Sequence, residues 1–170
     1  MNKKNIFTVL FFVAITFFTQ KMNAQTTIGG GIAYGTEIEN IGINATAQFF
    51  IKENIAIAPS FTYYLPKKVT GDFSFEWYEI SADGNYYFNI PDSKIKPYGL
   101  AGLNLSIVSI PSFNFGGFRT ESISDTNFGF NIGGGADFDL GENITPFAQL
   151  RYTISSLNQL VIMAGVRFKI

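Results

Sequence analysis

The last eleven residues, "LVIMAGVRFKI" from Leu160 to Ile170, alternate strictly between two kinds of side chain. Every second position from Leu160 onward is apolar, whereas the intervening positions include Arg167 and Lys169. Successive side chains of a β-strand point to opposite faces, so a repeat of two residues predicts a strand. One face of this strand carries no charge, and the other carries two cations.

The same alternation recurs along the chain, and helical periodicity is absent. After the N-terminal region, no stretch approaches the roughly 20 apolar residues that a membrane-spanning helix needs. The segments follow one another through links that are mostly short, which predicts antiparallel strands. The eight predicted strands cover residues 26–36, 41–51, 55–66, 74–90, 95–110, 125–140, 144–154 and 159–170.

The links differ between the two ends of the predicted strands. Tight turns follow the second, fourth and sixth strands, with the sequences "KEN" (52–54), "PDSK" (91–94) and "GEN" (141–143). The links at the other end vary in length, and the longest runs from Pro111 to Ser124. Short turns on one rim and longer loops on the other are typical of outer-membrane barrels, in which the short turns face the periplasm.

The two faces of the strands indicate a membrane barrel. In the strands over 41–51, 95–110, 144–154 and 159–170, one face is free of charge and the other is rich in Gly, Asn, Ser, Thr and Gln. Only 15% of the residues are charged, against about 25% in typical soluble domains. An apolar face toward lipid and a polar face toward the lumen fit this pattern. We predict an all-β, eight-stranded antiparallel up-and-down transmembrane β-barrel over residues 25–170, with a soluble lipocalin-like barrel as the alternative.

The N-terminus, "MNKKNIFTVLFFVAITFFTQKMNAQ", combines two lysines, an apolar run and a short polar stretch. This order predicts a signal peptide over residues 1–24 and export to the bacterial outer membrane, with an uncleaved anchor helix as the alternative. Removing the three lysines of this segment leaves nine of the twelve basic residues against thirteen acidic ones, a net charge of −4. No basic patch indicates a nucleic-acid partner.

The ending "AGVRFKI", Ala164–Ile170, looks like the C-terminal assembly signal of small outer-membrane barrels. It has a Gly followed by alternating apolar or aromatic residues, and it departs from the usual pattern by ending in Ile170 where Phe is common. The whole chain after the signal peptide resembles the eight-stranded OmpX and OmpA-transmembrane type, the outer membrane protein β-barrel domain family. This resemblance implies contact with outer-membrane lipids and lipopolysaccharide, and recognition of the last strand by the barrel-assembly machinery.

The polar face predicts a charged interior. Eight strands enclose a space that side chains just fill, and buried charges of both signs should pair. We expect Asp137 and Asp139 to meet Arg167 and Lys169 across the seventh strand, because an Arg side chain can span the roughly 10 Å of two strand spacings. The predicted lumen charge network consists of Glu79, Asp83, Lys96, Asp137, Asp139, Arg151, Arg167 and Lys169.

The composition argues against catalysis. The chain has no His and no Cys, which removes the commonest general base and the thiolate ligands. Outer-membrane proteases, lipid A deacylases and palmitoyl transferases look similar in outline, but that resemblance implies a catalytic His. Ser-Lys chemistry or a bare carboxylate pair is the remaining catalytic alternative. We expect no enzyme, no cofactor and no metal, and a filled lumen; a narrow ion or small-solute channel is the alternative function.

Three consecutive glycines in "FGFNIGGGADFDL", residues 128–140, raise the question of a phosphate-binding loop. Such a loop needs a glycine turn between a strand and a helix, and no helix follows here. The apolar alternation continues through the glycines, and a near copy, "IGGGIAY", occupies residues 28–34. The triplets therefore predict strand positions that bend and leave lumen room for large side chains.

The long link at 111–124 is the best candidate for surface contact. Its aromatic residues and one cation, Phe113, Phe115, Phe118 and Arg119, have the composition of a binding hot spot for an extracellular partner. The alternative is that they extend the neighbouring strands or belong to an aromatic girdle. We predict a structural or surface-interaction role for the protein.

Other aromatic residues are expected to anchor the barrel at the two membrane interfaces. They lie around the fourth strand and near the outer ends of the third and seventh strands. They are Trp77, Tyr78, Tyr86, Tyr87 and Phe88, together with Tyr63, Tyr64 and Tyr152.

Overall fold

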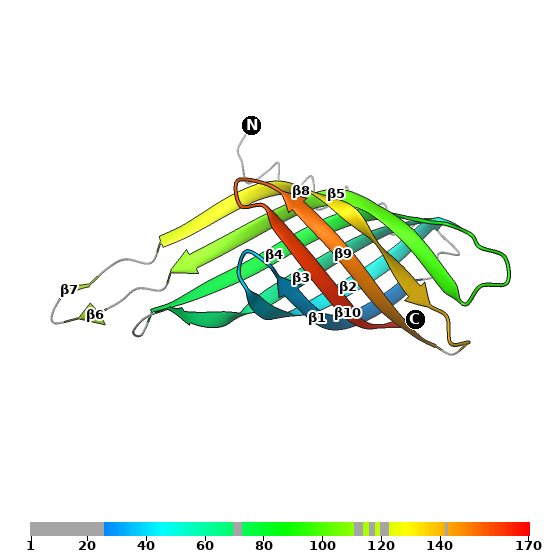
Figure 1. Ribbon diagram of the computed structural model, residues 1–170, viewed down its shortest axis with the longest axis horizontal. Helices are drawn as coiled ribbons and strands as arrows, with labels where there is room; N and C mark the ends of the chain where they lie inside the picture. Colours follow the sequence, from blue (N-terminus) through cyan, green and yellow to red (C-terminus); the bar gives the residue numbers. More distant parts are fainter. Residues whose placement is uncertain (1–25, 70–72, 111–113, 116–117, 120–122, 142) are drawn as a thin grey trace, which may run out of the picture.

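The computed structural model of the protein is a closed antiparallel β-barrel (Figure 1). It describes residues 26–69, 73–110, 114–115, 118–119, 123–141 and 143–170, so the predicted signal peptide lies outside the described part. The barrel strands are β1 (Thr26–Gly35), β2 (Asn40–Lys52), β3 (Ile55–Val69), β4 (Phe73–Tyr87), β5 (Ile95–Ile110), β8 (Ile123–Phe138), β9 (Ile144–Ile154) and β10 (Gln159–Lys169).

The strands follow one another around the barrel in chain order, with the sequence β1-β10-β9-β8-β5-β4-β3-β2. Each strand pairs antiparallel with its neighbours, and β10 closes the barrel by pairing with β1 from Thr27↔Lys169 to Gly35↔Val161. This topology confirms the predicted up-and-down barrel. The predicted strand limits agree to within a few residues; for example, β4 ends at Tyr87 and not at residue 90. None of the described residues belongs to a helix that is long and apolar enough to cross a membrane.

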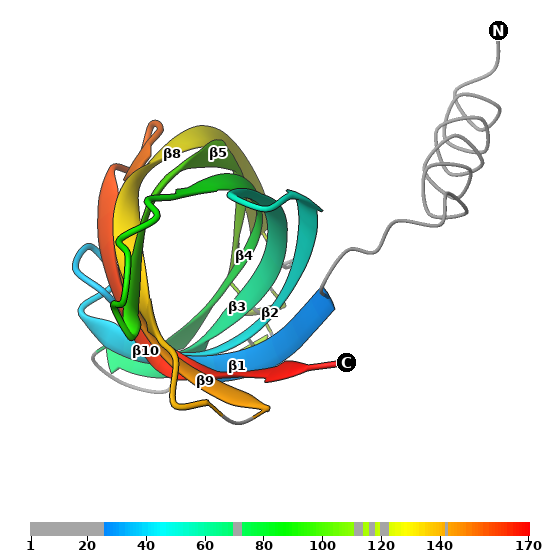
Figure 2. The same ribbon diagram turned by 90° about the vertical axis from the view of Figure 1, so that its right-hand side faces the viewer.

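The two rims of the barrel differ. The turn rim carries the connections at 53–54, 88–94 and 139–143, and both ends of the described chain lie there. The loop rim carries the connections at 36–39, 70–72, 111–122 and 155–158. Figure 1 shows the turn rim on the right, and Figure 2 looks onto it. Within the long 111–122 connection, β6 (Asn114–Phe115) and β7 (Phe118–Arg119) pair with each other as a small separate hairpin.

The alternation predicted from the sequence divides the inside of the barrel from the outside. In β10, Val161, Met163 and Arg167 are buried, whereas Leu160, Ile162 and Phe168 are exposed. The most buried large side chains include Arg151, Gln48 and Gln159, all at most 1% exposed, although polar groups are normally found at protein surfaces. The polar face therefore lines the lumen and the apolar face points outward, as in a barrel surrounded by lipid.

Three of the predicted interface anchors are wrong, and one of them is Trp77, which has the inward parity of Glu79 and packs against the buried cluster that includes Tyr64. Tyr64 is 1% exposed and Tyr87 is 7% exposed, so both point into the lumen. The reason is strand parity, because Tyr87 is an even number of residues from the buried Asp83 on β4. Tyr64 stands in the same relation to the buried Thr62 on β3. Tyr86, Phe88 and Tyr152 do point outward, with 49%, 53% and 41% of their surface exposed.

The glycine triplets lie within β1 and β8, as predicted. Their inward-facing members make room for large lumen side chains. A Cβ atom at Gly135 would lie 2.5 Å from the hydroxyl oxygen of Tyr98, and one at Gly29 would lie 2.9 Å from the Cγ atom of Arg167. Both distances are shorter than van der Waals contact allows. A backbone oxygen of a neighbouring strand, that of Val166 for Gly29 and that of Ala148 for Gly135, would also lie too close to such an atom, so a larger residue at either position would collide with the strand as well as with the side chain.

Substitution of the outward-facing Leu150 tests whether the apolar outer face of the barrel contacts lipid. Leu150 is 54% exposed near the middle of β9, and Ile154 is 52% exposed at its end. A Leu150→Arg substitution should lower the free energy of unfolding from lipid vesicles by about 2–4 kcal/mol, because a cation then faces the bilayer midplane. Ile154→Arg, on the same face of the same strand but near the interface, should cost about 0–1 kcal/mol. Urea titration followed by gel mobility measures both, and equal losses would contradict the assignment.

Candidate functional site

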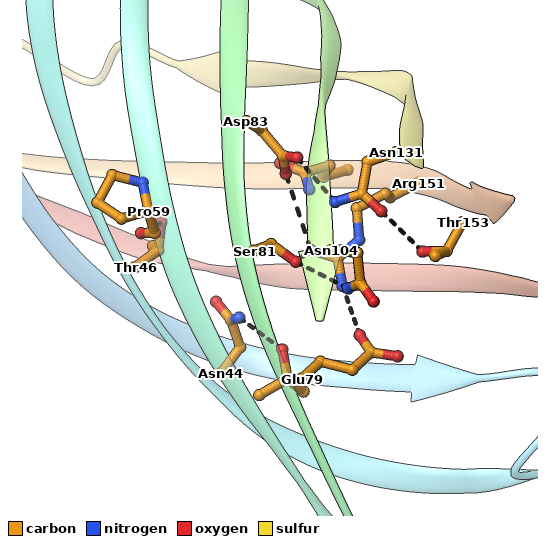
Figure 3. A network of polar contacts seen from close by, with 12 residues as sticks. Asn44, Thr46, Pro59, Glu79, Ser81, Asp83, Asn104, Asn131, Arg151 and Thr153 are labelled. Atoms are coloured by element: carbon orange, nitrogen blue, oxygen red, sulfur yellow. Dashed lines mark hydrogen bonds and ion pairs between the residues drawn. The ribbon is translucent and has the colours of Figure 1, made fainter. Parts of the chain in front are cut away.

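Arg151 occupies the middle of the lumen and is fully buried. It projects from β9, and its guanidinium group meets two carboxylates of β4, across the lumen (Figure 3). Nη2 lies 2.7 Å from Oε2 of Glu79, and Nη1 lies 3.8 Å from Oδ2 of Asp83. Both carboxylates have the inward parity of β4, two residues on either side of Ser81. An uncompensated charge here would be very unfavourable, so these pairs are a condition for a stable lumen.

Neutral side chains bond several of the other polar atoms around this ion pair, although Nε of Arg151 and Oε1 of Gln159 have no hydrogen-bond partner among the described residues. Arg151 also donates to the hydroxyl of Ser81 at 3.0 Å. Asn131 of β8 donates to Asp83 at 2.8 Å, and Gln159 of β10 donates to Glu79 at 2.7 Å. Strands from around the barrel thus contribute to one hydrogen-bonded layer. We call Arg151, Glu79, Ser81, Asp83, Asn131 and Gln159 the Arg151 cluster.

A second buried group lies closer to the turn rim. Arg167 of β10 forms an ion pair with Asp137 of β8, across β9. The hydroxyl of Tyr87 donates to the same carboxylate at 2.9 Å, and Arg167 donates to the hydroxyl of Tyr98 at 3.3 Å. The guanidinium carbon stands 3.8 Å from the ring centre of Phe147, a cation–π contact. We call Arg167, Asp137, Tyr87, Tyr98 and Phe147 the Arg167 cluster.

The space between the two clusters is small. A polar cavity of about 10 Å³ separates them, and both Asp83 and Arg167 line it. That volume is close to the minimum that a single water molecule occupies. This cavity therefore has room for about one water molecule between the side chains of the two clusters.

A third charged group, a single ion pair, lies at the turn rim itself. Nζ of Lys96 on β5 is 2.8 Å from Oδ2 of Asp139, just after β8. The bond from Lys96, with a second bond from the backbone N–H of Gly141, lowers the pKa of Asp139 from 3.8 to about 2. The folded pKa is the lower one, so this pair stabilises the fold above the unfolded pKa and loses its effect as the pH falls toward 2.

The structure brings the predicted lumen charges together in three groups instead of one. Asp137 meets Arg167 across the seventh barrel strand, as the expected register implied. Asp139 pairs with Lys96 and not with Lys169, because β5 is the direct neighbour of β8 and brings Lys96 opposite Asp137. Lys169 is exposed at the turn rim and contributes only a longer-range attraction to Asp139.

Sequence reasoning missed the neutral partners in the lumen. Gln159 and Tyr64 contact Glu79, whereas Tyr87 and Tyr98 serve the Arg167 cluster. Their signal was present, because all four have the inward parity of their strands. A search for charged residues alone does not identify these neutral partners.

The structure describes part of the candidate contact loop. Phe115, Phe118 and Arg119 belong to the β6–β7 hairpin, and Phe113 lies outside the described residues. In the part of the chain that the structure describes, no group of three or more His, Cys, Asp or Glu side chains is arranged to hold a metal ion.

Solved structures of other proteins share this fold. Neisserial surface protein A matches with a TM-score of 0.62 and 21% identity, covering 88% of this chain and 98% of that one. The N-terminal barrel of Pseudomonas aeruginosa OprF has a TM-score of 0.64 and 19% identity, covering 87% and 100%. The Yersinia pestis attachment invasion locus protein Ail, in complex with the heparin analogue sucrose octasulfate, has a TM-score of 0.65 and 17% identity, covering 88% and 100%.

These identities are low, and they establish the shared fold alone. Comparison of the sequence with curated proteins gives no match. A family model, however, matches residues 7–168, nearly the whole chain. Its description, "Outer membrane protein beta-barrel domain", agrees with the closed barrel, the outward apolar face and the charged lumen. The chain therefore belongs to the outer membrane protein β-barrel domain family.

Proposed function

We propose that the protein is a closed outer-membrane barrel that acts as a structural element of the membrane and presents its loop rim for contact with partners outside the cell. The observation that carries this proposal is the filled lumen, in which Arg151 has no exposed surface and pairs with carboxylates across the barrel. A wide channel needs a continuous water column, and the two charged clusters leave no room for one.

The orientation follows from the connections. Outer-membrane barrels have short periplasmic turns and longer extracellular loops. We therefore propose that the turn rim faces the periplasm and the loop rim faces outward. Residues 1–24 would direct export, β10 would be recognised by the assembly machinery, and the apolar outer face would contact lipid and lipopolysaccharide.

A catalytic role has little support. Glu79, Asp83 and Asp137, the buried carboxylates, each form an ion pair with an arginine. A carboxylate held in this way serves poorly as a nucleophile or general base, since its charge already stabilises a buried cation. We propose that these groups act in stability alone.

Bilayer conductance tests the closed lumen directly. The purified full-length protein should give no stable, reproducible conductance steps in planar bilayers at moderate voltage, because the Arg151 and Arg167 clusters block the path. A known open porin in the same bilayers serves as the positive control. Reproducible unitary steps that disappear with substitutions of lumen residues would replace this proposal by the channel alternative.

The Glu79–Arg151 pair should be a major source of stability. Glu79→Gln leaves Arg151 with only the more distant Asp83 as a counter-charge, and should lower the free energy of unfolding by about 3–5 kcal/mol. Glu76→Gln is the matched control, since Glu76 lies on the same strand, is not buried and accepts a bond from Tyr78. Its effect should stay within about 0.5 kcal/mol. Urea unfolding from lipid vesicles gives both values, and similar losses would contradict a lumen stabilised by this pair.

Removal of the aromatic side chains tests the loop. Replacement of Phe113, Phe115 and Phe118 by Ser should abolish adhesion of expressing cells to surfaces or ligands, while leaving intact the heat-dependent gel mobility shift that reports a folded barrel. The control replaces Thr36 and Glu37 in the shorter 36–39 connection at the same rim. Unchanged adhesion of the triple variant would remove the contact role of the loop.

A further inference from the structure

At the turn rim the lumen is hollow. Below the Arg167 cluster it opens into a cavity of about 840 Å³, which we call the turn-rim cavity. Pockets for small molecules typically measure about 300–1,000 Å³. The inner end of the cavity is closed by Tyr87, Asp137 and Arg167, which are held by the hydrogen bonds described above. The cavity is therefore a blind pocket that opens toward the side on which both chain ends lie.

The charges around the turn-rim cavity do not cancel. Four cations and three carboxylates line it: Lys52, Lys96, Arg167 and Lys169 with Glu53, Asp137 and Asp139. Asp137 is paired with Arg167, and Asp139 is paired with Lys96. In the described part of the chain Lys169 forms no ion pair, and it shares the inward parity of Arg167, two residues away. Lys52 and Glu53 form no ion pair among the described residues either, and their charges cancel, so one positive charge is left in excess. Of the two free ammonium groups, that of Lys169 is the one close enough to the paired carboxylates to attract Asp139.

The walls of the turn-rim cavity differ in polarity. On the arc formed by β2 and the end of β4, the inward-facing rings of Phe50 and Tyr87 contribute apolar surface and pack 5.3 Å apart. On the arc from β5 to β10, the lining is Lys96, Thr145, Arg167 and Lys169. Thr145 lies directly opposite Arg167 in the β9–β10 register, and so adds a hydroxyl group next to the lysine side. An apolar wall therefore faces a cationic one.

We propose that the turn-rim cavity binds an organic monocarboxylate with an apolar body, with the carboxylate at Lys169 and Thr145 and the body against Phe50 and Tyr87. The single negative charge of a carboxylate matches the single positive charge in excess. A phosphate dianion would carry a second negative charge that has no counter-charge in the partly enclosed cavity. Free small acids and the carboxyl end of a peptide share this chemistry. The site lies on the turn-rim side of the Arg167 cluster. The proposal therefore goes beyond the closed-barrel function, and the two can be tested separately.

Titration of the full-length barrel in lipid nanodiscs tests the site. N-acetyl-phenylalanine represents a free acid, N-acetyl-Ala-Ala-Phe represents a peptide end, and the C-terminal amide of each removes the charge. Backbone NMR signals around Thr145 and Lys169 should shift with at least one of the acids and much less with its amide. The acid that binds more tightly identifies the source of the carboxylate. Binding of neither acid, or equal binding of acid and amide, would overturn the proposal.

Two lysine variants separate this site from general attraction to a cationic rim. Lys169→Met should weaken binding of the acid by about fivefold, the effect of losing one partly exposed ion pair. Lys94→Met is the matched control, because Lys94 is exposed in the same rim but does not line the cavity. The heat-dependent mobility shift verifies that each variant is folded. Equal weakening by both variants, or tighter binding of inorganic phosphate than of either acid, would exclude a carboxylate site. These outcomes are independent of the bilayer conductance measurement, which tests the closed lumen and should show no conductance steps for either lysine variant.

Discussion

The charge of Arg151 in the middle of the lumen is the constraint on which the rest of the structure depends. A guanidinium group does not lose its proton at any ordinary pH, so burial cannot be relieved by neutralisation. The fold has to bring carboxylates to it, and Glu79 and Asp83 on β4 do so across the barrel. Because β9 and β4 are separated by two other strands on one side and by four on the other, this contact fixes the opposite walls relative to each other.

The same constraint accounts for the glycines. Long side chains such as Arg167 and Tyr98 fit inside eight strands only if positions beside them have no side chain. Gly29 and Gly135 supply this space, since a Cβ atom at either would collide both with the backbone of the neighbouring strand and with the side chain of Arg167 or Tyr98. Large polar side chains at some inward positions therefore require glycine at the neighbouring inward positions.

Much of this could be predicted from the sequence, because strand parity determines the direction of every side chain. The eight strands, the rims and the inward direction of the charged residues all follow from a repeat of two. The choice of partners does not, since it depends on the register between strands and on side-chain reach. Asp139 pairs with Lys96 of the adjacent strand for this reason. Tyr64 and Tyr87 were assigned to the membrane interfaces because of their residue type, although their parity already indicated the lumen.

A lumen filled in its middle restricts where such a protein can act. In the closed barrel that we propose, solutes have no path from one rim to the other, and the outer face of the barrel is occupied by lipid. Recognition is then confined to the two ends, which differ in physical character. The loop rim extends a long connection with its own small hairpin, suited to contact with large partners. The turn rim is recessed and closed by the Arg167 cluster, which suits a small ligand. The buried ion pairs therefore do more than stabilise the barrel, because they separate one interior into two independent surfaces.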